Sequence, residues 1–341
     1  MRITFLVPGR GLVGGVKVMG EYAGRLRARG HLVQIVYRRA ARNLKRLAQA
    51  LLRRRTRDAL DLAQCPLVGV REFDAGGVPD ADIVIATGLG ASRAALGLPP
   101  EKGRLVQLVQ GVLHLEESPD EARAVLAAPA RRIAVSEFVA RFLRERFGVD
   151  SVVVLNGVDH AQFTGAPRRL AEPRSVGMIY APGAGKAAEE GLEAVRLVRQ
   201  RWPQVRLVIY GARRPRGRTP RAEVFVRPSL RRLRAVYGLC DVWLAPSHSE
   251  GFGLPVLEAM ACRVVPVATR AGGHEEIVEE GASGFLVPVG DTSAMADRIS
   301  VLVQDEALLA RMSEAAYERS LAFDWDRSTD RLEALLRDWS A

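Results

Sequence analysis

One stretch of this chain, residues 246–286, combines two glutamates, two glycine-rich loops and alternating strand and helix patterns. An apolar strand pattern over residues 241–246 leads into a loop at 250–253, and helical periodicity begins at Leu254. Glu250 should therefore lie at a helix start, near backbone amides that have no partner within the helix. Glu258 shares a helix face with apolar residues, so it should be a carboxylate on the buried side that needs a partner.

These two carboxylates and the loops around them suggest a site for a phosphorylated sugar compound. Ribose hydroxyls would suit Glu258 and sugar hydroxyls would suit Glu250, because hydroxyls donate hydrogen bonds without bringing charge. A phosphate would suit the helix start between them. A second strand pattern, residues 264–268, runs into Gly272 and Gly273 and then a helical pattern, which predicts a second anion cradle. One such junction is an ordinary turn of an α/β protein, but two that flank a spaced glutamate pair weaken that explanation.

The segment SEGFGLPVLEAMA, with seven residues between its glutamates, resembles the signature of the family-4, or group 1, glycosyltransferases, which have the GT-B fold. The similarity also covers Gly14, Gly15 and Val16 after the first strand, AVSEFV at 134–139, NGVD at 156–159, the region around Lys186, and residues 237–286. It implies a retaining enzyme with two Rossmann-like domains that face each other across a cleft. It also implies a C-terminal helix that crosses back to the first domain.

The resemblance implies a role for individual residues. Glu250 would orient the transferred sugar and support developing charge, Lys186 would hold the donor diphosphate, and Glu258 would bind the ribose. His114 ends a strand in the first half and would lie near the donor sugar, although a lone histidine is more often a satisfied surface or core residue. The other donor-binding residues would be Gly14, Gly15, Gly251, Phe252, Gly253, Leu254, Gly272 and Gly273.

Lys186 also stands out from the residues themselves. It is one of four lysines in a chain in which 46 of the 50 basic residues are arginine. It follows a strand and precedes a helix, where the helix dipole disfavours a cation unless an anion is bound. A solvated lysine at a helix start is the plain alternative. The family usually has an arginine where Met178 stands, and Arg213 and Arg214 are candidates to replace it.

Strand and helix patterns alternate twice along the chain, which predicts an α/β protein with two doubly wound parallel sheets. The expected strands are residues 3–7, 32–37, 83–86, 105–109, 133–135 and 152–155, then 176–180, 207–210, 242–245, 264–268 and 285–287. We expect an acceptor domain at 1–160, a linker at 161–174, a donor domain at 175–322, and a crossing helix at about 323–341.

The net charge of +11 does not by itself indicate nucleic-acid binding, because the basic residues are spread over both halves and no nucleic-acid motif accompanies them. Between Arg38 and Arg57 they surround a leucine stripe and predict a basic amphipathic helix. This helix is either an ordinary surface helix or a contact with an anionic membrane. No apolar run is long enough for a membrane span or signal peptide, so we expect a cytoplasmic enzyme, either free or peripheral on the inner face of the membrane.

The expected co-substrates are a nucleotide sugar, UDP- or GDP-linked, and an acceptor hydroxyl of a sugar, glycolipid or small molecule. No bound metal is expected, because the histidines and acidic residues lack metal-ligand spacing. Two alternatives remain. Gly9, Gly11 and Gly14 form a G-x-G-x-x-G after the first strand, which would suit an NADP-dependent oxidoreductase. A catalytically silent GT-B protein that binds nucleotide or membrane is the other.

Overall fold

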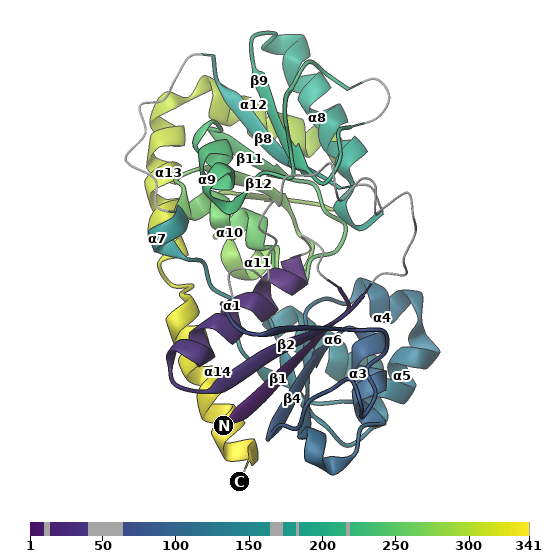
Figure 1. Ribbon diagram of the computed structural model, residues 1–341. Coiled ribbons are helices and arrows are strands. Elements are labelled where there is room, and N and C mark those ends of the chain that lie inside the picture. The colour runs from purple at the N-terminus through teal and green to yellow at the C-terminus, as the bar shows by residue number, and fades with distance from the viewer. Residues whose placement is uncertain (10–13, 40–63, 164–172, 182–183, 216–218, 341) are drawn as a thin grey trace, which may run out of the picture. The chain divides into compact units, whose positions relative to one another are not determined.

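The computed structural model describes residues 1–9, 14–39, 64–163, 173–181, 184–215 and 219–340. The chain divides into two compact units. The first comprises Met1–Leu155 together with Trp325–Ala341, and the second comprises Asn156–Asp324. Figure 1 follows the chain from its purple N-terminus to the yellow C-terminal helix, which belongs to the first unit. The predicted return of this helix to the first unit is therefore confirmed.

A parallel sheet forms the centre of the first unit. Within the described residues its strand order is β3-β2-β1-β4-β5-β6-β7. The order reverses between β1 and β4, and this switch point is where open α/β sheets commonly bind ligands. The central strands are buried almost throughout, as expected for strands covered on both faces. The strands are β1 (Arg2–Val7), β2 (Leu32–Arg38), β3 (Leu67–Val70), β4 (Ile83–Thr87), β5 (Arg104–Val109), β6 (Arg131–Ala134) and β7 (Val152–Val153).

The helices of the first unit connect these strands, except for the last, which enters from the end of the chain. Its described helices are α1 (Gly14–Ala28), α3 (Leu89–Leu96), α4 (Leu113–Glu117), α5 (Pro119–Ala127), α6 (Glu137–Phe147) and α14 (Trp325–Ser340), with a 3-10 turn at Pro100–Lys102. The rings of Tyr22 in α1 and Trp325 in α14 meet edge to face, with centroids 5.2 Å apart. The carbonyl of Trp339 accepts a hydrogen bond from Arg104 Nη1 at 2.8 Å. Both ends of α14 are thus attached to the first unit.

Glu333 provides a charged attachment near the middle of α14. Its carboxylate accepts hydrogen bonds from Arg337 Nε at 3.2 Å and from Arg29 Nη1 at 3.0 Å, and it lies 3.0 Å from His31 Nε2. The hydrogen bond from Arg337 lowers the pKa of Glu333 most, partial burial opposes it, and Arg29 and His31 lower it further. The resulting pKa lies at about 2, below the ordinary 4.5.

A carboxylate with a depressed pKa stabilises the folded state above its unfolded pKa, and this contribution is lost as pH falls through the folded value. We therefore expect the first unit to lose stability between pH 4.5 and about pH 2. Glu333→Gln should cost about 1–3 kcal/mol at neutral pH and flatten the pH dependence in that window, as measured by urea unfolding. Glu145→Gln, at an exposed position of α6, is the control. An unchanged acid slope in Glu333→Gln would contradict this assignment.

The second unit is built on another parallel sheet. Within the described residues its order is β10-β9-β8-β11-β12-β13. A core that includes Leu192, Leu244 and Ile299 fills the space between the sheet and its helices. The strands are β8 (Ser175–Tyr180), β9 (Arg206–Gly211), β10 (Glu223–Val226), β11 (Val242–Ala245), β12 (Val265–Thr269) and β13 (Phe285–Val287). The described helices are α7 (His160–Phe163), α8 (Ala188–Arg201), α9 (Leu230–Gly238), α10 (Leu254–Ala261), α11 (His274–Ile277), α12 (Thr292–Gln304) and α13 (Glu306–Ser320), with a 3-10 turn at Ala184–Lys186.

The two sheets confirm the predicted class of two doubly wound parallel domains, but two strands were missed. β3 and β10 have four residues each and lie at the edges of their sheets. Their apolar runs are short, because β3 reads LVGV with a glycine inside it and β10 reads EVFV, and their residues are half-buried or exposed. Short edge strands therefore carry too little hydrophobic signal to be found by pattern.

The segment 156–163 packs with the second unit, whereas the sequence pattern placed residues up to 160 in the first domain. The N–H of Val158 donates to the carbonyl of Phe323 at 3.2 Å. Cys262 Sγ donates to the carbonyl of Phe163 at 3.0 Å, and the Phe163 ring meets Tyr237 edge to face. The unit boundary thus follows Leu155. Most of the expected linker at 161–174 lies outside the described residues.

Candidate functional site

The carboxyl ends of three neighbouring strands in the second unit bring several predicted site residues together. Strands β8, β11 and β12 are adjacent and parallel, so their carboxyl ends share one edge of the sheet. Lys186 follows β8, Glu250 follows β11 and Gly272 follows β12. Residues from three separate segments therefore meet where α/β sheets commonly bind ligands.

Glu250 is held at this edge through both its side chain and its backbone. Its Oε1 accepts a hydrogen bond from Ser247 Oγ at 2.7 Å and forms an ion pair with the Lys186 ammonium. Its N–H donates to the carbonyl of Ala271 at 2.8 Å, and its own carbonyl accepts from the N–H of Gly273 at 3.0 Å. The carboxylate is thus fixed in position, with 12% of the side chain exposed to solvent.

Glu250 is ionised at neutral pH. Burial raises its pKa, but the positive charge of Lys186, His274 and the hydrogen bonds from Lys186 and Ser247 together bring the pKa below the ordinary value. Burial lowers the pKa of His274, which favours the neutral imidazole at pH 7. We therefore attribute the lowered pKa of Glu250 chiefly to Lys186. The pair can offer a fixed negative charge and a neighbouring ammonium to a ligand.

His274 is a buried residue next to the Glu250 loop, and the sequence analysis did not single it out. It is 1% exposed, and its Nδ1 lies 2.9 Å from the carbonyl oxygen of Thr269. Because a carbonyl oxygen only accepts, Nδ1 carries a proton. A Cβ at Gly253 would lie 2.7 Å from His274 Cδ2, and Gly253 has a φ of 103°. Glycine at 253 therefore allows the start of α10 to approach the imidazole.

The glycine loop before α10 is packed tightly against the loop after β12. Phe252 is 3% exposed, and its ring meets Phe323 edge to face. A Cβ at Gly273 would lie 2.4 Å from the Cα of Phe252, so only glycine allows this approach. Because the N–H of Gly273 already donates to Glu250, it is not available to an anion, which corrects the prediction of a cradle at that amide. Gly251 and Leu254 border the same loop, and no side chain caps the described start of α10.

Glu258 lies on the buried face of α10, as its periodicity predicted, with 4% of the residue exposed. Its Oε2 accepts a hydrogen bond from Tyr237 Oη at 2.8 Å, and Tyr237 Oη lies 3.0 Å from Tyr210 Oη. Burial, reinforced by the charge of Glu258, raises the pKa of both tyrosines, so both hydroxyls stay protonated. The sequence analysis predicted that this carboxylate needs a partner. One partner is the hydroxyl of Tyr237, which the sequence analysis did not identify.

Met178 does not mark a lost phosphate ligand. It lies inside β8 and is fully buried, and a Cβ at Gly191 of α8 would lie 2.8 Å from Met178 Cε. The side chain thus points into the core between sheet and helix, not toward the carboxyl edge, where a phosphate-binding arginine would have to lie. That Arg213 or Arg214 takes the place of an arginine at 178 stays a prediction. Both arginines follow β9 and are exposed.

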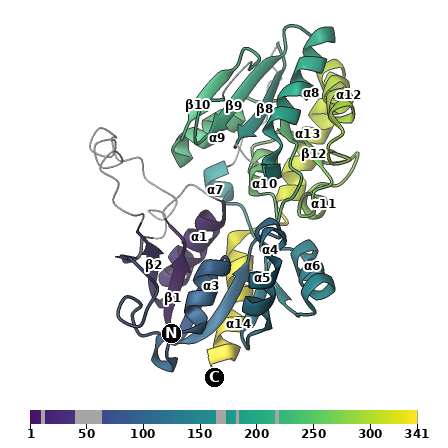
Figure 2. The ribbon, with the colours of Figure 1, turned by 90° about the vertical axis from the view of Figure 1, so that its right-hand side faces the viewer.

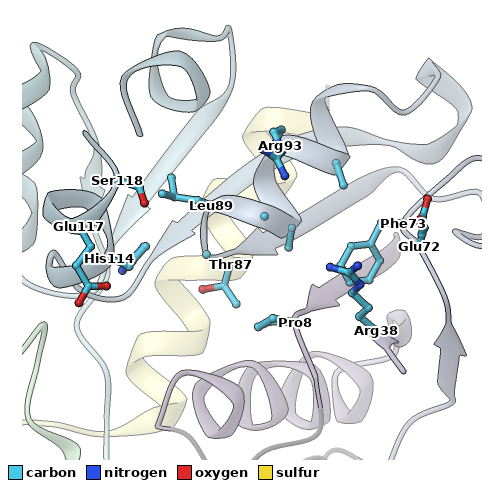
Figure 3. Close-up of a pocket in the computed structure, with 14 residues that line it drawn as sticks. Pro8, Arg38, Glu72, Phe73, Thr87, Leu89, Arg93, His114, Glu117 and Ser118 are labelled. Atoms are coloured by element: carbon cyan, nitrogen blue, oxygen red, sulfur yellow. The ribbon is translucent and has the colours of Figure 1, made fainter. Parts of the chain in front are cut away.

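A cavity of about 640 Å³ lies in the first unit, outside the carboxyl ends of its central strands. Figure 3 shows Arg38 and Glu72 beside Phe73 at one end of it, His114, Glu117 and Ser118 at the other, and Arg93 between the two groups. Thr87 and the start of α3 lie between them. Burial lowers the pKa of His114, opposed by Glu117, so the neutral imidazole is favoured at pH 7. The predicted catalytic histidine therefore opens into a cavity of its own unit.

Gly14 and Gly15 begin α1 and are not among the residues that line this cavity. The carbonyl of Gly15 accepts a hydrogen bond from Gln110 Nε2 at 3.0 Å, and Gln110 Nε2 also donates to Thr87 Oγ1 at 2.9 Å. Gln110 thus ties the start of α1 to the switch point of the sheet. Gly11 of the glycine motif lies outside the described residues.

Two further sequence predictions concern metals and membranes. Among the described residues, no group of three or more histidine, cysteine, aspartate or glutamate side chains could hold a metal ion. No helix within the described ranges is long and apolar enough to cross a membrane. Nearly all of the basic segment between Arg38 and Arg57, residues 40–57, lies outside those ranges.

Comparisons with known proteins agree with the geometry of the second unit. Residues 183–319 match the family model described as glycosyl transferases group 1. Over 103 residues the chain is 41% identical to a D-inositol 3-phosphate glycosyltransferase of Saccharomonospora viridis, a match that covers 30% of this chain and 24% of that protein. Over 211 residues it is 30% identical to a phosphatidyl-myo-inositol mannosyltransferase of Mycobacterium tuberculosis, which covers 57% and 56%. The matched stretches thus span between 24% and 56% of these relatives' own lengths.

Solved structures extend the likeness to both units. The structure of HepE from Anabaena in complex with UDP-glucose aligns with a TM-score of 0.78 at 19% identity, covering 99% of this chain and 100% of that one. A sucrose-phosphate synthase from Thermosynechococcus elongatus aligns with a TM-score of 0.77 at 16% identity, covering 99% of both chains. At these identities the likeness establishes the fold, and the predicted fold is confirmed.

Proposed function

Because residues 183–319 belong to the group 1 glycosyl transferases and the chain has the GT-B fold, we propose that this protein transfers a sugar from a nucleoside-diphosphate sugar to an acceptor hydroxyl. The observation that carries the proposal is the Lys186–Glu250 pair at the carboxyl edge of the second sheet. It sets one cation and one carboxylate beside a glycine-bounded helix start. A sugar diphosphate needs such a combination, because its phosphates are anionic and its sugar hydroxyls donate hydrogen bonds.

The donor site is assigned to the second unit. Lys186 binds the donor diphosphate and stabilises the negative charge that develops on it as the sugar leaves. Glu250 accepts hydrogen bonds from the transferred sugar and supports positive charge that develops on the sugar ring. Glu258 binds the ribose, and the hydrogen bond from Tyr237 holds Oε2 of Glu258 in place. Transfer then proceeds with retention of configuration and without a bound metal. HepE was solved in complex with UDP-glucose, which supports a UDP-sugar as the first donor to test.

The acceptor is assigned to the first unit. The cavity with His114 at one end combines apolar residues with polar and charged side chains, which suits a compact polyol or the head of a glycolipid. The names of the two relatives above include inositol 3-phosphate and phosphatidyl-myo-inositol, which supports a polyol hydroxyl as the nucleophile. Neutral His114 can accept a hydrogen bond from that hydroxyl. Such chemistry would take place in the cytoplasm, where nucleotide sugars are made.

A thermal-shift screen against UDP, GDP, ADP, CDP and NADP tests the proposal. A ligand at about 100 times its dissociation constant adds about 2.7 kcal/mol of stability to the folded state. A selective shift with one nucleoside diphosphate is expected and would identify the base of the donor. A shift with NADP alone would replace the proposal by the oxidoreductase alternative. Absence of any shift would contradict donor binding and leave the catalytically silent protein.

A further inference from the structure

Most of the net positive charge of this protein comes from one segment of the second unit. Residues 213–234 contain nine arginines and one glutamate, a formal charge of +8, whereas the whole chain carries +11. A general preference for arginine does not explain this, because the whole chain has 39 acidic residues against 50 basic ones. The segment is therefore unusual in its lack of acidic residues as well as in its arginines.

Six of these arginines lie in one region of the second unit, after β9 and β10 and in the first turns of α9. Arg227 joins the ends of β9 and β10: its N–H donates to the carbonyl of Gly211 at 2.8 Å, and its side-chain Nε donates to the carbonyl of Ala212 at 3.3 Å. Figure 2 shows β10 at the edge of the sheet with α9 close to it. All six side chains are exposed, and we call them the arginine surface: Arg213, Arg214, Arg227, Arg231, Arg232 and Arg234.

The arginine surface is not neutralised by the described part of the protein. The one glutamate of the segment, Glu223, pairs instead with Arg206 at 3.2 Å. No ion pair joins any of the six arginines to a carboxylate of the described residues. Uncompensated like charges repel one another and produce a positive potential that extends into solvent. A partner of opposite charge would relieve this repulsion.

The start of α9 also lacks compensating negative charge. Ser229 caps the helix, its Oγ accepting from the N–H of Arg232, but the first turn contains no acidic residue. Instead it contains Arg231 and Arg232, with Arg234 following, at the positive end of the helix dipole, where cations are unfavourable. Arginines at this end cost stability in the free protein, and a bound anion removes that cost.

We propose that the arginine surface binds the anionic face of a lipid bilayer. A nucleic acid is the other common polyanion, but single strands bind through exposed aromatic side chains on which bases stack. The described part of the segment offers none, since Phe225 is half-buried. It offers an apolar side chain instead, because Val226 is 43% exposed beside Arg227. Exposed arginines next to an exposed aliphatic side chain match lipid headgroups above an acyl layer.

This contact uses other residues than the Lys186–Glu250 pair and the basic segment between Arg38 and Arg57. It lies on the second unit, and it requires neither donor nor acceptor. If the acceptor is a lipid, the same contact brings the enzyme to its substrate. If the acceptor is a small molecule, membrane binding remains as a property of its own.

Vesicle co-sedimentation tests the proposal with the full chain. Phosphatidylcholine vesicles that contain phosphatidylglycerol should bind the protein, vesicles of phosphatidylcholine alone should not, and added salt should release it. Each basic residue near an anionic bilayer contributes about fivefold to partitioning, so R231Q/R232Q/R234Q should lower the partition coefficient about 100-fold. Its thermal unfolding midpoint should be unchanged or higher, because three cations leave the helix start. If it falls instead, R213Q/R214Q/R227G repeats the test outside α9.

A charge-matched control separates this surface from net charge. R146Q/R201Q/R311Q removes three exposed arginines elsewhere and should bind anionic vesicles like the wild type. Equal loss of binding in both triple variants would overturn the proposal in favour of a non-specific charge effect. Equal binding to both kinds of vesicle would overturn it as well. Displacement from vesicles by a single-stranded oligonucleotide at equal charge would make the surface a nucleic-acid site.

Discussion

Replacing Glu250 with alanine is expected to lower the rate of sugar transfer by about 1,000-fold or more while the protein stays folded. The substitution removes the carboxylate that accepts from Ser247 and pairs with Lys186, so the transferred sugar loses its fixed acceptor. The backbone contacts of residue 250 to Ala271 and Gly273 do not involve the side chain and should persist. The loop geometry is therefore expected to survive the loss of activity.

The rate is measured as release of nucleoside diphosphate, with the donor found in the thermal-shift screen. Glu318→Ala, at an exposed position of α13, provides the matched control and should transfer sugar at the normal rate. Comparable unfolding midpoints for both variants would exclude misfolding as the cause. A Glu250→Ala enzyme with near-normal turnover would remove this residue from the mechanism.

Lys186→Met is expected to reduce kcat/KM by about 100- to 1,000-fold, because the donor diphosphate loses its ammonium partner in the transition state. A second effect distinguishes Lys186 from a purely structural lysine. Burial raises the pKa of Glu250, and Lys186 is the largest influence that lowers it. Without the ammonium, the pKa of Glu250 rises, and activity that needs the ionised carboxylate is lost at a higher pH.

The acid limb of the pH–rate profile should therefore move to higher pH in Lys186→Met. Lys186→Arg keeps the positive charge and should return the limb toward its wild-type position, even if the rate recovers only in part. Glu250→Gln provides the complementary control, because it has no carboxylate to titrate. If the acid limb of Lys186→Met coincides with that of the wild type, Lys186 does not control the ionisation of Glu250.

The fold was predictable because its signals are local. Inner strands such as Ile83–Thr87 and Val265–Thr269 are apolar along their whole length, since both faces are covered. Glycine and helix periodicity then mark where each strand ends. The edge strands Leu67–Val70 and Glu223–Val226 give a weaker signal, because each has only four residues and the apolar run is interrupted by a glycine in the first and preceded by a glutamate in the second. The same limit applies to segment 156–163, whose packing depends on contacts far along the chain.

For the candidate site too, some features could be predicted from the sequence and others could not. Glu258 was placed on a buried helix face from the 3.6-residue period alone, and its burial agrees. Its hydrogen bond from Tyr237 could not be derived from the sequence, because Tyr237 lies in α9 and Glu258 in α10, and a local pattern does not show which helices are neighbours. Met178 was interpreted as a missing phosphate ligand, although the alternation of side chains along β8 directs it to the core.

By itself, the sequence determined two parallel α/β sheets, the carboxyl edge on which Lys186 and Glu250 lie, and the burial of Glu258. These features depend on backbone periodicity and on the direction of parallel strands, both of which act within a few residues. Only the tertiary structure decided that Lys186 pairs with Glu250, that His274 lies next to Gly253, and that six exposed arginines after β9 and β10 and in α9 pair with no carboxylate of the described residues. Those contacts depend on strand order and on the packing of distant segments, which no local pattern encodes.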